Sequence, residues 1–139
     1  MSGNFGYELD LTTFTEADKE SVKGQIELYK QLRPLIQFDE FYRLINPFEQ
    51  ASAAWMFVSE DKKEALVAFF QVLSEPNAPL RKLRLKGLAP ESNYLLYDAG
   101  NQDERVEIFG GDELMHVGLH LPIWKGDFRS RLYRLIMEE

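Results

Sequence analysis

Two histidines four residues apart are the first candidates for chemistry in this sequence of 139 residues. On a helix, His116 and His120 would lie on one face and could together bind a metal ion. Gly118 between them and Pro122 after them argue against a helix, and no Glu-x-x pattern or third ligand lies nearby. On a strand the two side chains would also share a face, so a weak metal site stays open. A surface or hydrogen-bonding role is the favoured interpretation.

Paired carboxylates are the second candidate, because general acid–base chemistry often uses acidic groups in pairs. Three pairs lie in predicted turns, where solvated acids are expected: Glu60-Asp61, Asp103-Glu104 and Asp112-Glu113. Glu8 and Asp10 differ, because they end a predicted strand ahead of a helix and occupy alternate positions on one face. Active sites of barrel folds gather at such strand ends, so Glu8 and Asp10 are the carboxylate candidates.

The string Gly110-Gly-Asp-Glu-Leu114 resembles the Gly-Gly-Asp-Glu-Phe signature of diguanylate cyclases, in which a hairpin turn brings acidic groups to a metal and a nucleotide. Those enzymes also carry an acidic Asp-x-Asp-x-Phe-Lys stretch upstream, on a strand of an α/β sheet. This sequence contains no such stretch, and the flanking residues are typical of an all-β protein. A turn that needs glycine is therefore the favoured interpretation.

Aromatic and basic side chains suggest two kinds of binding surface. Five aromatic residues could form a platform that stacks on sugars, with Trp124 and Tyr133 as its exposed pair: Tyr42, Trp55, Tyr94, Trp124 and Tyr133. At strand spacing, however, aromatic side chains more often belong to the core. The one basic cluster is formed by four residues near the C-terminal end: Lys125, Arg129, Arg131 and Arg134. Arg129 and Arg131 alternate, so both can point to solvent from the outer face of a strand.

Composition narrows the functional classes further. The chain has 23 acidic against 16 basic residues, a net charge of -7, which argues against a general nucleic-acid binder. No apolar run approaches the ~20 residues of a membrane helix, and the N-terminus lacks the zones of a signal peptide. Without cysteine there is neither a disulfide nor a thiolate metal site. These features predict a cytoplasmic protein that binds neither nucleic acid nor membranes.

The first quarter of the chain is predicted to contain a strand at residues 5–11 and then a helix. Thr15 and Asp18 form a Thr-x-x-Asp version of the capping box, and Pro34 is expected to end the helix after about 17 residues. Four side chains at helical spacing form one apolar stripe: Val22, Ile26, Tyr29 and Leu32. We expect this stripe to pack onto the rest of the protein or onto a second copy.

After residue 38 the pattern changes to short apolar runs separated by turn residues. The predicted strands cover residues 41–45, 53–59, 65–73, 83–86, 94–97, 105–109, 114–117 and 128–136. The clearest hairpin pairs residues 55–58 with 65–70 across a charged turn. The predicted fold is mainly β: an antiparallel, Greek-key-like β-sandwich of about eight strands, preceded by one α-helix.

Several strings together resemble the C-terminal end of family 36 glycoside hydrolases, the α-galactosidases of the melibiase type. They occur in family order over nearly the whole chain: Ser2-Gly-Asn-Phe-Gly-Tyr-Glu-Leu-Asp-Leu11, Leu35-Ile36-Gln37, Phe41-Tyr-Arg-Leu44, Ala54-Trp-Met-Phe-Val-Ser-Glu-Asp-Lys62, Leu83-Arg-Leu-Lys-Gly-Leu88, Gly110-Gly-Asp-Glu-Leu-Met115 and Gly126-Asp-Phe-Arg-Ser-Arg-Leu132. The resemblance implies that residues 1–38 are the last strand and helix of a (β/α)₈ catalytic barrel. Residues 39–139 would be the closing antiparallel β domain.

The same resemblance implies that the catalytic groups lie elsewhere. The family retains anomeric configuration with two aspartates, a nucleophile in a Lys-Trp-Asp motif and an acid/base in a Ser-Asp motif. Neither motif occurs in this sequence, so we expect no catalytic, cofactor-binding or metal-binding residue, and no cofactor. The expected function is a non-catalytic packing domain of an α-galactosidase, whose partners are the parent barrel and other subunits of a homo-oligomer. The alternative is a module that binds an α-galactoside through exposed aromatic residues.

Overall fold

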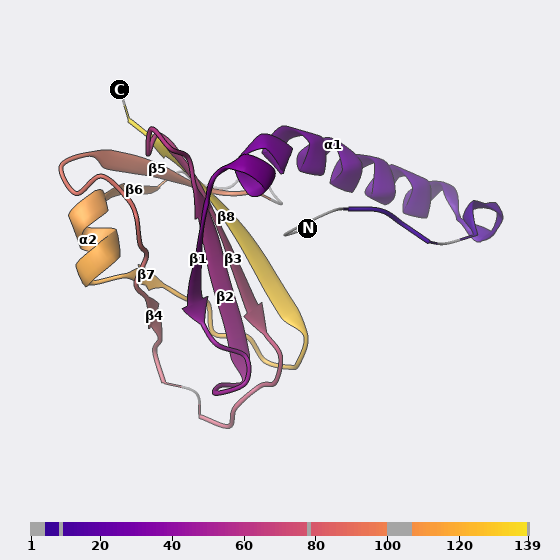
Figure 1. Ribbon diagram of the computed structural model, residues 1–139. Coiled ribbons are helices and arrows are strands. Elements are labelled where there is room, and N and C mark those ends of the chain that lie inside the picture. Colours follow the sequence, from indigo (N-terminus) through magenta and orange to yellow (C-terminus); the bar gives the residue numbers. More distant parts are fainter. Residues whose placement is uncertain (1–4, 9, 78, 100–106, 139) are drawn as a thin grey trace.

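The computed structural model describes residues 5–8, 10–77, 79–99 and 107–138 (Figure 1). In these ranges a long helix precedes a β domain with one short helix. The elements are η1 (Leu11–Thr13, a 3₁₀ turn), α1 (Glu16–Phe38), β1 (Glu40–Ile45), β2 (Ser52–Val58), β3 (Glu64–Gln71), β4 (Lys82–Leu83), β5 (Asn93–Asp98), β6 (Glu107–Gly110), α2 (Gly111–His116), β7 (Leu119–His120) and β8 (Arg129–Met137). The prediction of a mainly β protein with about eight strands after one helix is confirmed.

All strand pairings in the described residues are antiparallel, in two sheets of unequal size. The larger sheet has the order β1-β2-β3-β8-β5-β6, and the smaller consists of β4 and β7. The second layer of the predicted sandwich is thus a two-stranded ribbon, with α2 beside it (Figure 1). The predicted hairpin is confirmed, because Trp55 lies opposite Ala68 and Val58 opposite Ala65 in the β2–β3 register.

The main hydrophobic core lies between the larger sheet and the layer formed by β4, β7 and α2. Its fully buried members come from both layers and include Phe69, Tyr94, Leu114 and Leu135. Burying each such side chain is worth about 1.5–3 kcal/mol. Leu85 also donates a backbone hydrogen bond to the carbonyl oxygen of Leu114 at 3.0 Å, which ties α2 to the segment after β4.

Tyr94 joins two loops across this core through its buried hydroxyl. The hydroxyl donates to the carbonyl oxygen of Lys62 at 2.8 Å and accepts from the backbone N–H of Ala89 at 2.9 Å. Burial is the main reason that the pKa of Tyr94 is raised above its usual value. The hydroxyl therefore stays protonated, as its donor role requires.

We expect Tyr94→Phe to lower the free energy of unfolding by about 1–3 kcal/mol, because the Lys62 carbonyl and the Ala89 N–H would both lose their partner. Urea denaturation followed by tryptophan fluorescence measures this. Tyr97→Phe, on the same strand but half exposed, is the control and should change the stability by less than about 1 kcal/mol. Equal effects of the two substitutions would contradict the bridging role of Tyr94.

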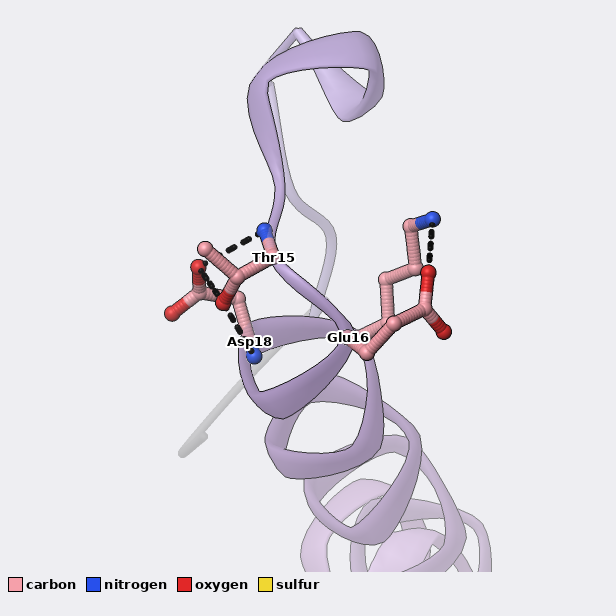
Figure 2. Close-up of polar contacts among 4 residues, drawn as sticks. Thr15, Glu16 and Asp18 are labelled. Carbon is pink, nitrogen blue, oxygen red and sulfur yellow. Dashed lines mark hydrogen bonds and ion pairs between the residues drawn. The ribbon is translucent and has the colours of Figure 1, made fainter.

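Helix α1 starts at the predicted capping box (Figure 2). The Thr15 hydroxyl accepts from the backbone N–H of Asp18 at 3.2 Å, and the Asp18 carboxylate accepts from the backbone N–H of Thr15 at 3.0 Å. Figure 2 also shows the ion pair between Glu16 and Lys19, whose atoms are 2.7 Å apart. Two N–H groups that the helix itself leaves unpaired are thereby satisfied.

We expect this cap to weaken in acid. Hydrogen bonds from the Thr15 hydroxyl and backbone hold the pKa of Asp18 below its usual value. A lowered pKa in the folded state means that the stabilisation is complete above the unfolded-state pKa and is lost as the pH falls through the folded-state value. Cα chemical shifts of residues 16–20 should therefore move toward coil values between about pH 5 and pH 2. In the Thr15→Ala variant, the pH dependence of these chemical shifts should be much smaller. The same pH dependence in both proteins would contradict the role of the cap.

The helix does not end at Pro34, contrary to the prediction. Pro34 lies inside α1, which continues to Phe38. A proline in a helix removes one hydrogen bond and costs about 3 kcal/mol. Leu35 and Ile36, which follow it, are buried against the sheet, and their burial offsets that cost.

The predicted strand at residues 5–11 is also wrong in the described part of that segment. Residues 5–8 and 10 form no ladder, and Leu11–Thr13 is a 3₁₀ turn. An extended segment becomes a β-strand only when it pairs with a neighbouring strand. This segment runs along α1 and has no strand beside it (Figure 1). Phe5 instead packs on Tyr29, with ring centroids 5.1 Å apart.

Two further strand predictions need correction. Residues 114–116 lie in helix α2, and Val117 follows it, so the predicted strand at 114–117 is wrong. The helix forms because Asp112 and Glu113 are favourable in a helical first turn and because Leu114 fills the core. Of residues 83–86, Leu83 alone lies in a strand. The predicted run 105–109 corresponds to β6, which starts at Glu107; residues 105 and 106 lie outside the described ranges.

Candidate functional site

The strongest candidate for a functional site is a hollow between α1 and the sheet. Strands β2 and β3 are apolar on both faces, so both faces require a cover. One face meets the main core, and the other lies under the C-terminal half of α1. There, Tyr29, Leu32, Leu35 and Ile36 pack against Phe57 and Leu66 in a second buried cluster.

The hollow has a volume of about 350 Å³ and opens beside this cluster. Its lining is mostly apolar and comprises Gln25, Leu28, Ile36, Trp55, Phe57, Leu66, Ala68, Phe70, Asp98, Ser130, Arg131 and Leu132. Trp55 stacks on Phe70, with ring centroids 4.6 Å apart and planes at 25°. Trp55 Nε1 is buried and has no hydrogen-bond partner within the described residues.

One ion pair borders the hollow. Arg131 Nε donates to Asp98 Oδ2 at 2.7 Å, and both side chains are largely shielded from solvent. Asp98 is the one carboxylate among the described lining residues, and it is neutralised by Arg131. Glycoside hydrolysis requires two carboxylates on either side of the scissile bond. The described lining therefore does not by itself supply that pair of carboxylates.

The candidate carboxylates Glu8 and Asp10 do not form a site. Both are exposed and lie ahead of η1 in the extended segment beside α1. Asp10 Oδ1 accepts from the Thr12 hydroxyl at 2.6 Å and from the Thr12 backbone N–H at 2.9 Å. These bonds hold the pKa of Asp10 below its usual value, so this carboxylate stays charged and closes a local turn.

The string at residues 110–114 serves the fold. Gly110 ends β6 and precedes α2, and Gly111 is buried against Ala89. The backbone N–H of Gly111 donates to the carbonyl oxygen of Ser92 at 2.8 Å, and Asp112 and Glu113 are exposed. The predicted turn is thus the start of a helix, and it packs on a β domain instead of the α/β sheet that a cyclase requires.

The two histidines lie on different elements. His116 is the last residue of α2, where its Nδ1 lies 2.9 Å from the carbonyl oxygen of Asp112, and His120 is an exposed residue of β7. No group of three potential ligands gathers anywhere in the described ranges. Of the acidic pairs, Glu60-Asp61 lies in the β2–β3 turn, where Asp61 accepts from Ser59 and Lys63, and Asp103-Glu104 lies outside the described residues.

The proposed sugar platform does not form from the expected pair. Tyr133 is only 5% exposed, so it cannot stack on a ligand in solvent. Trp124 stacks on Phe69 of the main core with centroids 5.8 Å apart, and Tyr94 is fully buried. Tyr42 is half-buried and donates to the Glu40 carboxylate, which raises the pKa of Tyr42. Aromatic side chains at strand spacing are mainly core residues here.

The basic cluster is divided by ion pairs. Arg131 binds Asp98, and Arg134 Nε donates to Glu64 Oε1 at 2.7 Å. Arg129 and Lys125 are exposed. The expected pair of solvent-facing arginines is therefore reduced to Arg129 alone, because Arg131 is partly buried in its ion pair.

Sequence reasoning missed the hollow, although one signal for it was present. The alternation rule assigns Val67 and Phe69 to one face of β3, and Leu66, Ala68 and Phe70 to the other. Apolar residues on both faces of a strand indicate cover on both faces. Two of the polar members of the lining, Gln25 and Asp98, come from elements distant in sequence and carry no such signal.

Comparisons with known proteins agree with this fold. A family model described as the glycosyl hydrolase family 36 C-terminal domain matches residues 52–135, well over half of the chain. The chain belongs to glycoside hydrolase family 36. A second model, described as melibiase, matches residues 1–39, which include the whole of α1.

The similar proteins of this family are α-galactosidases. Over 97% of this chain, the sequence is 53% identical to α-galactosidase AgaA of Geobacillus stearothermophilus, and over 95% it is 46% identical to α-galactosidase 1 of Pediococcus pentosaceus. The crystal structure of AgaA matches 99% of the chain with a TM-score of 0.89. Crystal structures of AgaA variants contain raffinose and stachyose. The chain spans only 18% of the length of AgaA.

None of the described helices combines the length and the apolar character that crossing a bilayer requires.

Proposed function

We propose that this chain is the non-catalytic C-terminal part of an α-galactosidase and that its role is to pack against the catalytic domain. The observation that carries the proposal is the 53% identity to an α-galactosidase over nearly the full chain, in a sequence that contains neither Lys-Trp-Asp nor Ser-Asp. The whole protein would hydrolyse terminal α-galactosides with retention of configuration. Sugars of the raffinose and stachyose type are the expected substrates, since both occur bound to AgaA variants.

The proposed division places residues 1–38 in the last strand and helix of the barrel, and residues 39–139 in the closing β domain. It is supported by the melibiase match to residues 1–39 and by the C-terminal domain match to residues 52–135. The structure adds support, because α1 ends at Phe38 and β1 starts at Glu40. Contacts to other subunits of a homo-oligomer belong to the same proposal.

A chimera tests this function. The segment of AgaA that aligns with this chain is replaced by the chain itself, and hydrolysis of a chromogenic α-galactoside is measured. We expect the chimera to be active and the isolated chain to show no turnover above a mock preparation. Turnover by the isolated chain would contradict the non-catalytic role, and an inactive chimera would contradict the packing role.

A further inference from the structure

The sheet face that α1 crosses is covered over only part of its area. Phe57 is buried beneath α1, whereas Trp55, Phe70 and Leu132 beside it are only half-buried. At the β1 edge of the same face, Phe41 is 51% exposed although its ring lies 5.3 Å from that of Phe57. We call the four residues of this face that stay exposed or half-buried the uncovered strip: Phe41, Trp55, Phe70 and Leu132. Large apolar side chains that stay exposed on one face of a sheet are typical of an interaction surface.

The hollow beside the strip contains a polar group that needs a partner. Trp55 Nε1 is buried without a hydrogen-bond acceptor among the described residues. An unpaired buried donor is unfavourable, and native proteins leave few of them. A polypeptide segment that filled the hollow would bring backbone carbonyl oxygens, any of which could accept from the indole N–H. A segment in the hollow would therefore add apolar contacts to its lining and a hydrogen-bond acceptor for Trp55 Nε1.

The relatives indicate what this segment is. AgaA is more than five times longer than this chain. Even so, 99% of the residues of this chain superpose on the AgaA structure, with a TM-score of 0.89. Helix α1 and the sheet therefore keep one arrangement in the longer protein. Phe5 contacts Tyr29 in the cluster where α1 meets the sheet, and Leu28 of that cluster also lines the hollow. Phe5, the first described residue, is thus held close to the hollow, so a segment joined N-terminally to this chain has the hollow within reach.

We propose that the uncovered strip and the hollow form the surface that receives the preceding part of an α-galactosidase polypeptide. The inference rests on the proposed function and specifies which exposed apolar surface packs against the catalytic domain. A second apolar group lies at the far end of the sheet and includes Phe48, which is 94% exposed in the turn after β1. Phe41 lies near the start of β1, about 13 Å along the strand from Ile45 at its end, and Phe48 follows in the turn beyond, so their roles can be tested separately.

The test compares the isolated chain with the AgaA chimera. Phe41→Asp and Ser130→Glu each place a charge on the proposed surface, at an exposed strip residue and at an exposed residue of the hollow. Phe48→Asp is the matched control, because it makes the same change at another exposed phenylalanine. Melting temperature is measured for the isolated chain, and the half-life of α-galactosidase activity near the inactivation temperature is measured for the chimera.

In the isolated chain we expect all three substitutions to shift the melting temperature by less than about 4 °C, since each changes an exposed side chain. In the chimera, Phe41→Asp and Ser130→Glu should shorten the half-life about tenfold or more, because a charge is then buried at a domain contact. Phe48→Asp should leave it unchanged. This difference between the two proteins separates a docking surface from a residue that merely stabilises the β domain.

Other outcomes overturn the proposal. If the chimera is active but Phe48→Asp shortens the half-life and Phe41→Asp does not, the proposed function stands and the docking surface is wrong. If the isolated chain is a dimer by light scattering and Phe41→Asp makes it monomeric, a second copy covers the strip instead. An inactive unsubstituted chimera contradicts the proposed function itself, and with it the partner named here.

Discussion

Replacing Gly111 with alanine should destabilise the β domain by about 3 kcal/mol or more. A Cβ atom at this position would lie 2.0 Å from the carbonyl oxygen of Ala89 and 3.1 Å from Cε2 of Tyr94. The nearest atom belongs to the backbone and cannot rotate away. Relief of the overlap requires the segment around Ala89 to move, and that segment holds the Ala89–Tyr94 and Gly111–Ser92 hydrogen bonds.

Gly24→Ala is the control for this prediction. Gly24 is an exposed residue of α1, and an added Cβ would have no neighbour within 4 Å. Alanine in an exposed helix is preferred over glycine by about 0.5–1 kcal/mol, so this substitution should stabilise α1. Urea denaturation, with near-UV circular dichroism for the core and far-UV for the helix, measures both variants. A Gly111→Ala protein with the midpoint of the unsubstituted chain would contradict the close packing of α2 on Ala89.

The features that the sequence predicted correctly depend on neighbouring residues. The cap at Thr15 needs only Asp18 three positions later, and the β2–β3 hairpin needs only two apolar runs and a charged turn between them. The resemblance of many strings in order also identified the family, which no single motif could do. These signals act within one element or one pair of elements, so they can be read along the chain.

The features that were missed depend on distant contacts. Residues 114–117 look like a strand, and α2 forms because Gly111 fits against Ala89 and Leu114 fills the core. Pro34 looks like a helix end, and the helix continues because residues beyond it are buried on β2 and β3. The hollow brings Gln25 together with Asp98, more than seventy positions later. Local propensity gives way to burial in each case.

Leu32→Ala should detach α1 from the sheet while the β domain stays folded. Leu32 is fully buried in the cluster with Phe57 and Leu66, and truncating a buried leucine costs about 2–5 kcal/mol. Only four buried side chains hold α1, and Figure 1 shows its N-terminal half extending away from the sheet. We expect amide exchange in residues 26–38 to accelerate about 30-fold or more. Tryptophan emission should also shift to the red as Trp55 becomes exposed.

Val22→Ala is the matched control, because Val22 lies on the same predicted stripe but outside the cluster on the sheet. Its truncation should change exchange in residues 26–38 less than about threefold, since alanine also favours the helix. Amides of β3 and β8 should keep their protection in both variants. If Leu32→Ala accelerates exchange in β3 and β8 as much as in α1, the helix and the β domain unfold as one unit. The face beneath α1 would then be part of a single core, and the uncovered strip would extend that core instead of forming a separate docking surface.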